Sequence, residues 1–311
     1  MPSAALPHKP VLLIEVLEFL RLQAGMTVVD GTLGNGGHAI EILKRIGSQG
    51  RLIGMDQDPS AIGKCRERLL DFPQVVFRQE NFENVERVLD RLNIPSVDAV
   101  ILDVGFSSDQ LEDGTRGFSF EREGPLDMRM NPFTTTRARD LVNKLSAQKL
   151  EKLFCDYGEE RYARRFAQGV CRARELNPIQ TTQDLVHALM ETLPYGLRAP
   201  RGRRPARARR HPATRVFQAL RIAVNDELRV LDRALPLFWQ RLKPGGRMAV
   251  ISFHSLEDRI VKNHFRQWYR DKKALRITKS PITPSRDEVR DNPRARSAKL
   301  RVVEKIDARG G

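Results

Sequence analysis

Three short apolar runs that each end on an aspartate place the strongest constraint on this chain. Asp30 follows Thr-Val-Val, Asp56 follows Leu-Ile-Gly-Met, and Asp103 follows Ala-Val-Ile-Leu. Runs of this kind, separated by helix-length segments, are typical of buried parallel strands. Because open α/β sheets bind ligands at the carboxyl ends of their strands, the three carboxylates predict an acidic cleft at that edge.

The overall charge has the opposite sign. The chain has 54 Lys and Arg residues against 39 Asp and Glu residues, a formal charge of +15. An acidic cleft in a basic body predicts a cationic small molecule in the cleft and a polyanionic partner outside it.

The sequence shows no membrane-span, signal-peptide or metal-binding pattern. No apolar stretch approaches the roughly 18 residues of a membrane span, and the first ten residues lack the regions of a signal peptide. We therefore expect a cytoplasmic protein with no membrane partner. The three cysteines and six histidines show no metal-ligand spacing, so no metal site is expected.

The apolar pattern predicts a mainly parallel α/β sheet with an insertion. Helices and strands alternate up to about residue 108, which is the β-α-β rhythm of a right-handed parallel sheet. From there to residue 214 the pattern is helical, and an α/β pattern then returns. We predict one α/β domain formed by residues 1–110 and 215–311, which encloses a substrate-binding helical insertion at residues 111–214.

Two details of the second α/β segment follow from its pattern. Apolar residues spaced by three and four from Phe217 to Leu235 predict one helix with a buried face, which Pro236 ends or kinks. Residues 248–253 are a predicted core strand, and residues 299–304 a predicted edge strand.

A glycine loop follows the first strand. The stretch from Gly34 through Gly36 and Gly37 to Ala39 formally satisfies G-x-G-x-x-[G/A], a dinucleotide pattern. A dinucleotide would bring anionic pyrophosphate near Asp30, which would repel it. S-adenosylmethionine instead carries an ammonium and a sulfonium, and no phosphate. The loop and Asp30 therefore favour a methyl donor.

Two further residues fit either cofactor. Asp56, at the tip of the second strand, can accept both ribose hydroxyls. Phe82, after the third strand, either packs on the adenine or belongs to the core. Each aspartate alone could be an ordinary cap or turn residue, but three at successive strand tips, with the glycine loop, predict a cofactor site.

Several long motifs resemble those of the bacterial MraW family, the methyltransferases that act on cytosine N4 in 16S ribosomal RNA. The matching stretches run nearly end to end: Asp30-Gly-Thr-Leu-Gly-Asn-Gly-Gly-His38, Asp56-Gln-Asp-Pro-Ser-Ala61, Gly124-Pro-Leu-Asp-Met-Arg-Met130, Phe217-Gln-Ala-Leu-Arg-Ile222 and Val250-Ile-Ser-Phe-His-Ser-Leu-Glu-Asp-Arg259. One loop departs from the family, since Asp109 replaces a proline.

The resemblance implies a class I S-adenosylmethionine-dependent methyltransferase fold with a helical insertion. It implies that the target is the cytidine usually numbered 1402 in the decoding centre, so that the partner is 16S rRNA. We expect this RNA within an assembled small ribosomal subunit, although the sequence leaves naked rRNA open as the substrate. It also implies cofactor contacts from Gly36, Gly37, His38, Asp56, Phe82, Asp103 and Gln110.

The chemistry of the acceptor points to the turn after the fourth strand. An exocyclic cytosine amine is a poor nucleophile, because its lone pair is conjugated into the ring, so the enzyme must accept hydrogen bonds from its N–H groups. Many amino-methyltransferases use an Asp/Asn/Ser-Pro-Pro-aromatic turn here. Asp103-Val-Gly-Phe106 keeps the acid and the aromatic but neither proline. Phe106 is expected to stack on a flipped base.

Other polar candidates lie elsewhere in the motifs. Asp127 and Arg129 form either a loop ion pair or a substrate contact. His254, after the last core strand, is expected either to accept a proton from the amine or to orient the base. Ser255 is the expected cap of the helix that follows.

The arginine-dense run at residues 198–210 offers a phosphate-binding footprint or a solvated linker. Two other classes remain open from the residues alone. A ribosome-assembly factor would bind RNA and cofactor without turnover, and an oxidoreductase would bind NAD in the glycine loop.

Overall fold

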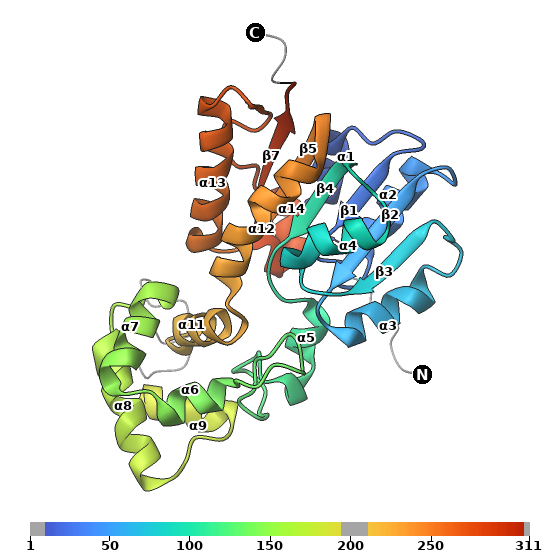
Figure 1. Cartoon of the computed structure of the whole chain (residues 1–311). Coiled ribbons are helices and arrows are strands. Elements are labelled where there is room, and N and C mark those ends of the chain that lie inside the picture. The colour runs from blue at the N-terminus through green and yellow to red at the C-terminus, as the bar shows by residue number, and fades with distance from the viewer. Residues whose placement is uncertain (1–9, 194–210, 308–311) are drawn as a thin grey trace. The chain divides into compact units, whose positions relative to one another are not determined.

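The computed structural model describes residues 10–193 and 211–307 (Figure 1). The chain divides into two compact units, one formed by residues 1–106 with 228–311 and the other by residues 107–227. The second unit extends past residue 214 because α11 (Ala213–Asn225) packs against α7 (Ala147–Gly158), where Gln218 donates to the carbonyl of Tyr157 at 3.0 Å. No helix in the described ranges is long and apolar enough to cross a membrane.

The first unit is built on a seven-stranded sheet in the order β3-β2-β1-β4-β5-β7-β6. Strands β1 to β5 pair in parallel, and β7 is antiparallel to both neighbours. This is the order of class I methyltransferases, so the predicted fold class is confirmed. The strands are β1 (Thr27–Asp30), β2 (Arg51–Asp56), β3 (Val75–Gln79), β4 (Val97–Asp103), β5 (Leu242–Ser252), β6 (Ala274–Arg276) and β7 (Lys299–Lys305).

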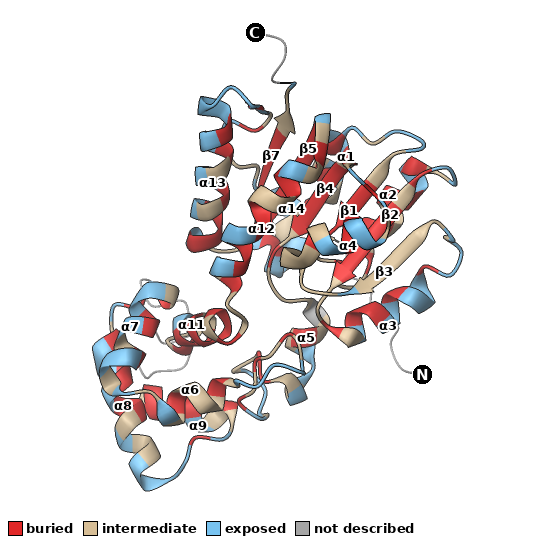
Figure 2. Cartoon of the chain, viewed as in Figure 1, coloured by how far each residue is buried: buried red, intermediate tan, exposed pale blue. Residues whose placement is uncertain are grey.

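Two helical layers cover this sheet. Alternate strand residues point to opposite faces, so that Val28 packs with the cluster of α1 to α3 and Val29 with the cluster of α4, α12 and α13. Figure 2 shows the strands β1 and β4 buried and the outer sides of the helices exposed. The helices of this unit are α1 (Leu13–Leu20), α2 (Gly37–Ile46), α3 (Pro59–Arg68), α4 (Val85–Arg91), α12 (Glu227–Arg241), α13 (Ser255–Arg270) and α14 (Arg286–Asp291).

The second unit is helical. Its core contains the fully buried side chains of Phe154 and Phe166, on α7 and α8. An isolated bridge between Pro125 and Thr181 ties the loop before α6 to the start of α9. Besides α7 and α11, its helices are α5 (Ser108–Glu112), α6 (Ala138–Lys144), α8 (Ala163–Leu176) and α9 (Thr182–Met190).

Two sequence predictions about the C-terminal part were wrong. The single helix from Phe217 to Leu235 is two helices, because Asp226 takes the left-handed conformation (φ 51°) and ends α11. Pro236 lies inside α12 and does not end it. The strand at residues 299–304 is not at the sheet edge, because the short strand β6 pairs with its far side.

Candidate active site

The three aspartates close three neighbouring strands. Asp30 is the last residue of β1, Asp56 of β2 and Asp103 of β4, and the sheet order β2-β1-β4 places these strands side by side. The carboxyl ends of parallel strands meet at one edge of the sheet. The predicted acidic edge is therefore present.

Thr32 joins two of the three aspartates. Its backbone N–H donates to Oδ1 of Asp30 at 3.1 Å, and its hydroxyl oxygen accepts from the backbone N–H of Asp103 at 2.6 Å. Thr32 was not among the residues predicted from the sequence. Its position in the sequence could have indicated this role, because an aspartate commonly accepts a hydrogen bond from the backbone N–H two residues further on.

Asp56 holds the glycine loop. Its Oδ2 accepts from the backbone N–H of Gly34 at 2.9 Å, and its Oδ1 accepts from that of Asp58 at 2.9 Å. A carboxylate has about four acceptor sites. The backbone N–H of Gln57 donates to Asp56 as well, which still leaves acceptor capacity for a ligand hydroxyl.

The glycine loop turns directly into α2. Gly36 is the N-cap with φ 73°, and a Cβ there would meet Sγ of Cys65 at 3.0 Å, so this turn requires glycine. Gly37 is the first residue of α2. Because the cap has no side chain, the backbone N–H groups that open α2 have no side-chain cap. These groups suit an anionic ligand group such as a carboxylate.

His38 presents a hydrogen-bond acceptor to Asp103. Its Nε2 lies 3.0 Å from the carbonyl oxygen of Val11. A carbonyl can only accept, so Nε2 carries the proton and Nδ1 keeps its lone pair. Nδ1 lies 3.8 Å from Oδ2 of Asp103. Burial lowers the pKa of His38 to about 4, so the ring is neutral near pH 7.

Burial raises the pKa of all three carboxyl groups. It raises the pKa of Asp103 to about 8, with Asp30 and Glu257 raising it further by charge repulsion. Burial also raises the pKa of Asp30 to about 7 and that of Asp56 to about 6. A cation bound among them would favour the ionised forms.

The polar atoms left over at this edge fit a cationic donor of hydrogen bonds. Oδ1 of Asp103 is buried and has no hydrogen-bond partner within the described ranges. The lone pair on Nδ1 of His38 faces the same carboxyl group. An ammonium group between Nδ1 of His38 and Oδ2 of Asp103 would donate to both, and Oδ1 would remain for a further N–H donor. The residues present therefore fit the ammonium end of S-adenosylmethionine.

Two aromatic candidates lie beside the strand ends. Phe82 opens a 3-10 helix (Phe82–Asn84) after β3 and is partly buried against the core cluster of α4 and α12. Phe106 is half-buried, three residues after the end of β4. Gly105, between β4 and Phe106, has φ 132°, which only glycine adopts readily, so the turn after Asp103 depends on it.

His254 is the N-cap of α13, which corrects the prediction that Ser255 fills this position. Its Nδ1 accepts from the backbone N–H of Glu257 at 3.4 Å, and Oε2 of Glu257 accepts from the backbone N–H of His254 at 3.2 Å, which is a reciprocal capping box. Nε2 of His254 lies 3.0 Å from Oε1 of Glu257. The side chain of His254 is only 9% exposed, so both ring nitrogens face Glu257.

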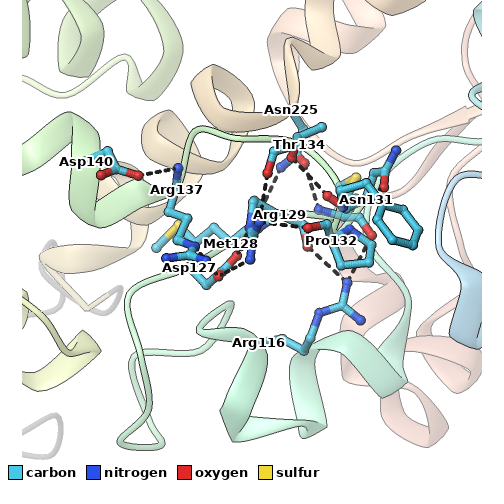
Figure 3. A network of polar contacts seen from close by, with 12 residues as sticks. Arg116, Asp127, Met128, Arg129, Asn131, Pro132, Thr134, Arg137, Asp140 and Asn225 are labelled. Atoms are coloured by element: carbon cyan, nitrogen blue, oxygen red, sulfur yellow. Dashed lines mark hydrogen bonds and ion pairs between the residues drawn. The ribbon is translucent and has the colours of Figure 1, made fainter.

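Gln110 and Asp127 belong to the unit formed by residues 107–227. Gln110 is buried in α5, and its Oε1 accepts from the backbone N–H of Ser107 at 3.0 Å. Asp127 forms a two-pronged ion pair with Arg129, at 2.7 Å to Nε and 2.8 Å to Nη2 (Figure 3). Arg129 holds the pKa of Asp127 below its ordinary value by hydrogen bonding and charge, against the effect of burial.

Residues 5–306 match the MraW methylase family. The chain belongs to this family. Membership excludes the dinucleotide interpretation of the glycine loop, and S-adenosylmethionine is the cofactor of this methylase.

Relatives of this MraW methylase are similar along their whole length. Ribosomal RNA small subunit methyltransferase H of Halothermothrix orenii is 43% identical over 316 residues, which cover 97% of this chain and 99% of the relative. The protein of the same name from Symbiobacterium thermophilum is 44% identical over 320 residues, with 98% of each chain covered.

Among solved structures, an rRNA methylase from Streptococcus thermophilus has a TM-score of 0.46 at 12% identity, covering 97% of this chain and 100% of that one. A SAM-dependent O-methyltransferase from Thermotoga maritima has a TM-score of 0.44 at 10% identity, covering 98% and 69%. The fold class of the MraW methylase rests on its own sheet order.

Proposed function

We propose that this methylase transfers a methyl group from S-adenosylmethionine to the exocyclic N4 of a cytidine, position 1402 of 16S rRNA in the decoding centre. The observation that carries the proposal is the unpartnered buried Oδ1 of Asp103, which ends β4 directly before the turn to Phe106. The printed name of relatives that are 42–44% identical supports small-subunit rRNA as the substrate.

The cofactor contacts follow from the polar atoms of the strand ends. Asp30, Oδ2 of Asp103 and Nδ1 of His38 hold the ammonium group. Asp56 accepts the ribose hydroxyls, and Phe82 packs on the adenine. Gly34, Gly36 and Gly37 bring the backbone close to the ligand.

The acceptor chemistry is assigned to the turn after β4. The bound cofactor supplies an electrophilic methyl group on its sulfonium. Oδ1 of Asp103 accepts a hydrogen bond from the cytosine N4 and takes its proton as the new bond forms, which frees the nitrogen lone pair. Phe106 stacks on the flipped base.

His254 and Asp127 are assigned positioning roles. Both ring nitrogens of His254 face Glu257 within the α13 cap. The carboxylate oxygens of Asp127 accept from Arg129, and Nε of Arg137 lies 3.3 Å from Oδ2. The cap formed by His254 holds the start of α13, and the ion pairs of Asp127 hold its own loop in the helical unit. Nε2 of His254 has no hydrogen-bond partner within the described ranges, and neither side chain is assigned contact with the reacting atoms.

Exposed basic helix faces support a polyanionic partner. Three arginines on α8 and three basic residues on α13 are exposed, and none of the six forms an ion pair within the described ranges; they are Arg164, Arg165, Arg172, Lys262, Arg266 and Arg270. Unpaired cations of this kind bind phosphates. The arginine run at 198–210 lies outside the described residues. We assign 16S rRNA within the assembled small subunit as the partner, in the cytoplasm.

A methylation assay with a labelled donor and small subunits from cells lacking this protein tests the function. We expect one N4-methylcytidine per subunit at position 1402 by mass mapping, and none with the Asp103→Asn variant. Tight RNA binding without turnover would make the protein an assembly factor instead. Methylation at a carbon atom or at another position would contradict the assigned acceptor.

A further inference from the structure

Phe133 lies at the apex of a tight turn in the helical unit. Oδ1 of Asn131 accepts from the backbone N–H of Phe133 at 2.9 Å, and the carbonyl of Asn131 accepts from the backbone N–H of Thr134 at 3.2 Å. The Phe133 side chain is 76% exposed. The turn therefore presents a large aromatic ring to solvent.

Arg129 forms hydrogen bonds with the backbone of this turn on both sides of Phe133. Its Nη1 donates to the carbonyls of Pro132 and Thr134, each at 2.7 Å. The guanidinium itself is fixed by its two-pronged ion pair with Asp127, as Figure 3 shows. Because the same guanidinium bonds the carboxylate of Asp127 and both carbonyls around Phe133, the network favours the turn conformation that leaves the ring exposed.

The segment that carries Arg129 is fixed in turn. Nδ2 of Asn225 donates to the carbonyl of Met128, and Oδ1 of Asn225 accepts from the backbone N–H of Met130, both at 2.8 Å. Nη2 of Arg116 donates to the carbonyls of Arg129 and Met130 at 2.9 and 3.0 Å. Met128 is held at φ 62°, a conformation rare for a residue with a side chain. The whole support is rigid and slightly strained.

This support distinguishes Phe133 from an incidental surface residue. Single exposed apolar residues are normal, and Leu176, 83% exposed at the end of α8, is one of them. Phe133 differs because a network of side chains holds its backbone. The network is cationic overall, since its three guanidinium groups (Arg116, Arg129 and Arg137) outnumber its two carboxylates (Asp127 and Asp140).

We propose that Phe133 is a stacking platform for an unpaired base of the RNA substrate. The inference rests on the proposed function, since it names a contact with the same RNA. Proteins recognise splayed-out bases by stacking them on aromatic side chains. A flipped target leaves its neighbours without a stacking partner. A ring on a rigid cationic support stacks such a base with little loss of entropy.

Four substitutions at Phe133 test the stacking. The Phe133→Ala variant should bind 16S rRNA roughly 5- to 150-fold more weakly than the wild type, with cofactor affinity unchanged. Phe133→Tyr and Phe133→Trp should keep the affinity because they keep a flat ring. Phe133→Leu keeps an apolar side chain but lacks the aromatic ring, so this variant should lose most of the RNA affinity. Leu176→Ala, which removes an exposed apolar side chain of the same unit, is the matched control and should bind normally.

Fluorescence gives a direct readout. The chain has two tryptophans, Trp239 and Trp268, which are 7% and 8% exposed and stack on each other. The tryptophan introduced by Phe133→Trp is therefore the exposed one, and RNA should quench its emission while the wild-type emission changes little.

Equal RNA affinity of the wild type and the Ala and Leu variants would overturn the proposal. A lower melting temperature of Phe133→Ala with normal RNA binding would also overturn it, by assigning the ring to packing within the protein. Failure of the proposed function is a separate result, because the wild type itself would then fail to methylate RNA.

Discussion

The Asp103→Asn variant should lose cofactor affinity and gain stability. Removing a carboxylate that faces a buried cation costs on the order of 2–5 kcal/mol of binding free energy, which is roughly a 30- to 4,000-fold rise in the dissociation constant for S-adenosylmethionine. Methyl transfer should become undetectable, because the same side chain is assigned to accept the N4 proton. Calorimetry and a single-turnover assay measure the two effects.

The gain in stability follows from the raised pKa of Asp103. Its folded-state pKa of about 8 lies above the ordinary value of 3.8, so the folded state holds a proton that the unfolded state has lost. The stability of the cofactor-free protein therefore falls as pH rises from about 4 through 8. Asparagine does not ionise and so avoids this loss of stability. The variant should therefore have a higher melting temperature than the wild type at pH 8 and the same melting temperature below pH 4.

The same pKa sets the pH dependence of binding. Cofactor affinity of the wild type should weaken as pH falls below about 8 and Asp103 protonates. Binding at pH 7 should release protons, which calorimetry in two buffers of different ionisation enthalpy detects. Uptake of protons, or a constant affinity from pH 6 to 9, would contradict the assigned ammonium contact.

Asp98 offers a matched control on the same strand. It lies at the start of β4, where its carboxylate accepts from the backbone N–H of Thr27 at 2.8 Å and from Nζ of Lys243 at 2.7 Å. Asp98→Asn should lower the melting temperature and leave cofactor affinity intact. Equal binding losses in both variants would show that Asp103 acts only through the stability of the sheet.

The sequence predicted the sheet and its acidic edge because these depend on local pattern. Buried parallel strands need continuous apolar runs, so β1, β2 and β4 were visible together with the aspartates that end them. The start of α3 is also local: Pro59 is its first residue, and the carboxylate of the N-cap Asp58 accepts from the backbone N–H of Ser60 at 3.0 Å. These features need only neighbours in sequence.

The features that sequence analysis missed depend on contacts between distant segments. β6 is three residues long, and only its pairing with β7 makes it a strand. Thr32 joins Asp30 to Asp103, which is 71 residues away from Thr32. His254 caps α13 with its ring, a role that the Ser/Asp pattern of caps assigns to the next residue. Tertiary context decided each case.

The Asp127→Asn variant should unfold more easily and bind RNA more weakly, with normal cofactor affinity. Asp127 and Arg129 are 20% and 14% exposed, and removing one member of a largely buried pair leaves the other uncompensated, at about 3 kcal/mol of unfolding free energy. The pKa of Asp127 lies below its ordinary value of 3.8. Its stabilisation is therefore present at neutral pH and disappears as pH falls below 4. Denaturant melts at pH 7 and pH 3 measure this difference.

A double variant separates the stability of the helical unit from the positioning of Phe133. Asp127→Leu with Arg129→Met removes both charges, and replacing a buried pair by apolar residues of similar volume commonly restores stability. The hydrogen bonds from Arg129 to the carbonyls of Pro132 and Thr134 are lost all the same. We therefore expect the double variant to regain the melting temperature of the wild type while its RNA affinity stays low. Recovery of both the melting temperature and the RNA affinity would show that the network only stabilises the helical unit. A fall of more than about 100-fold in the single-turnover rate of Asp127→Asn at saturating RNA, with an unchanged melting temperature, would instead make Asp127 a catalytic residue.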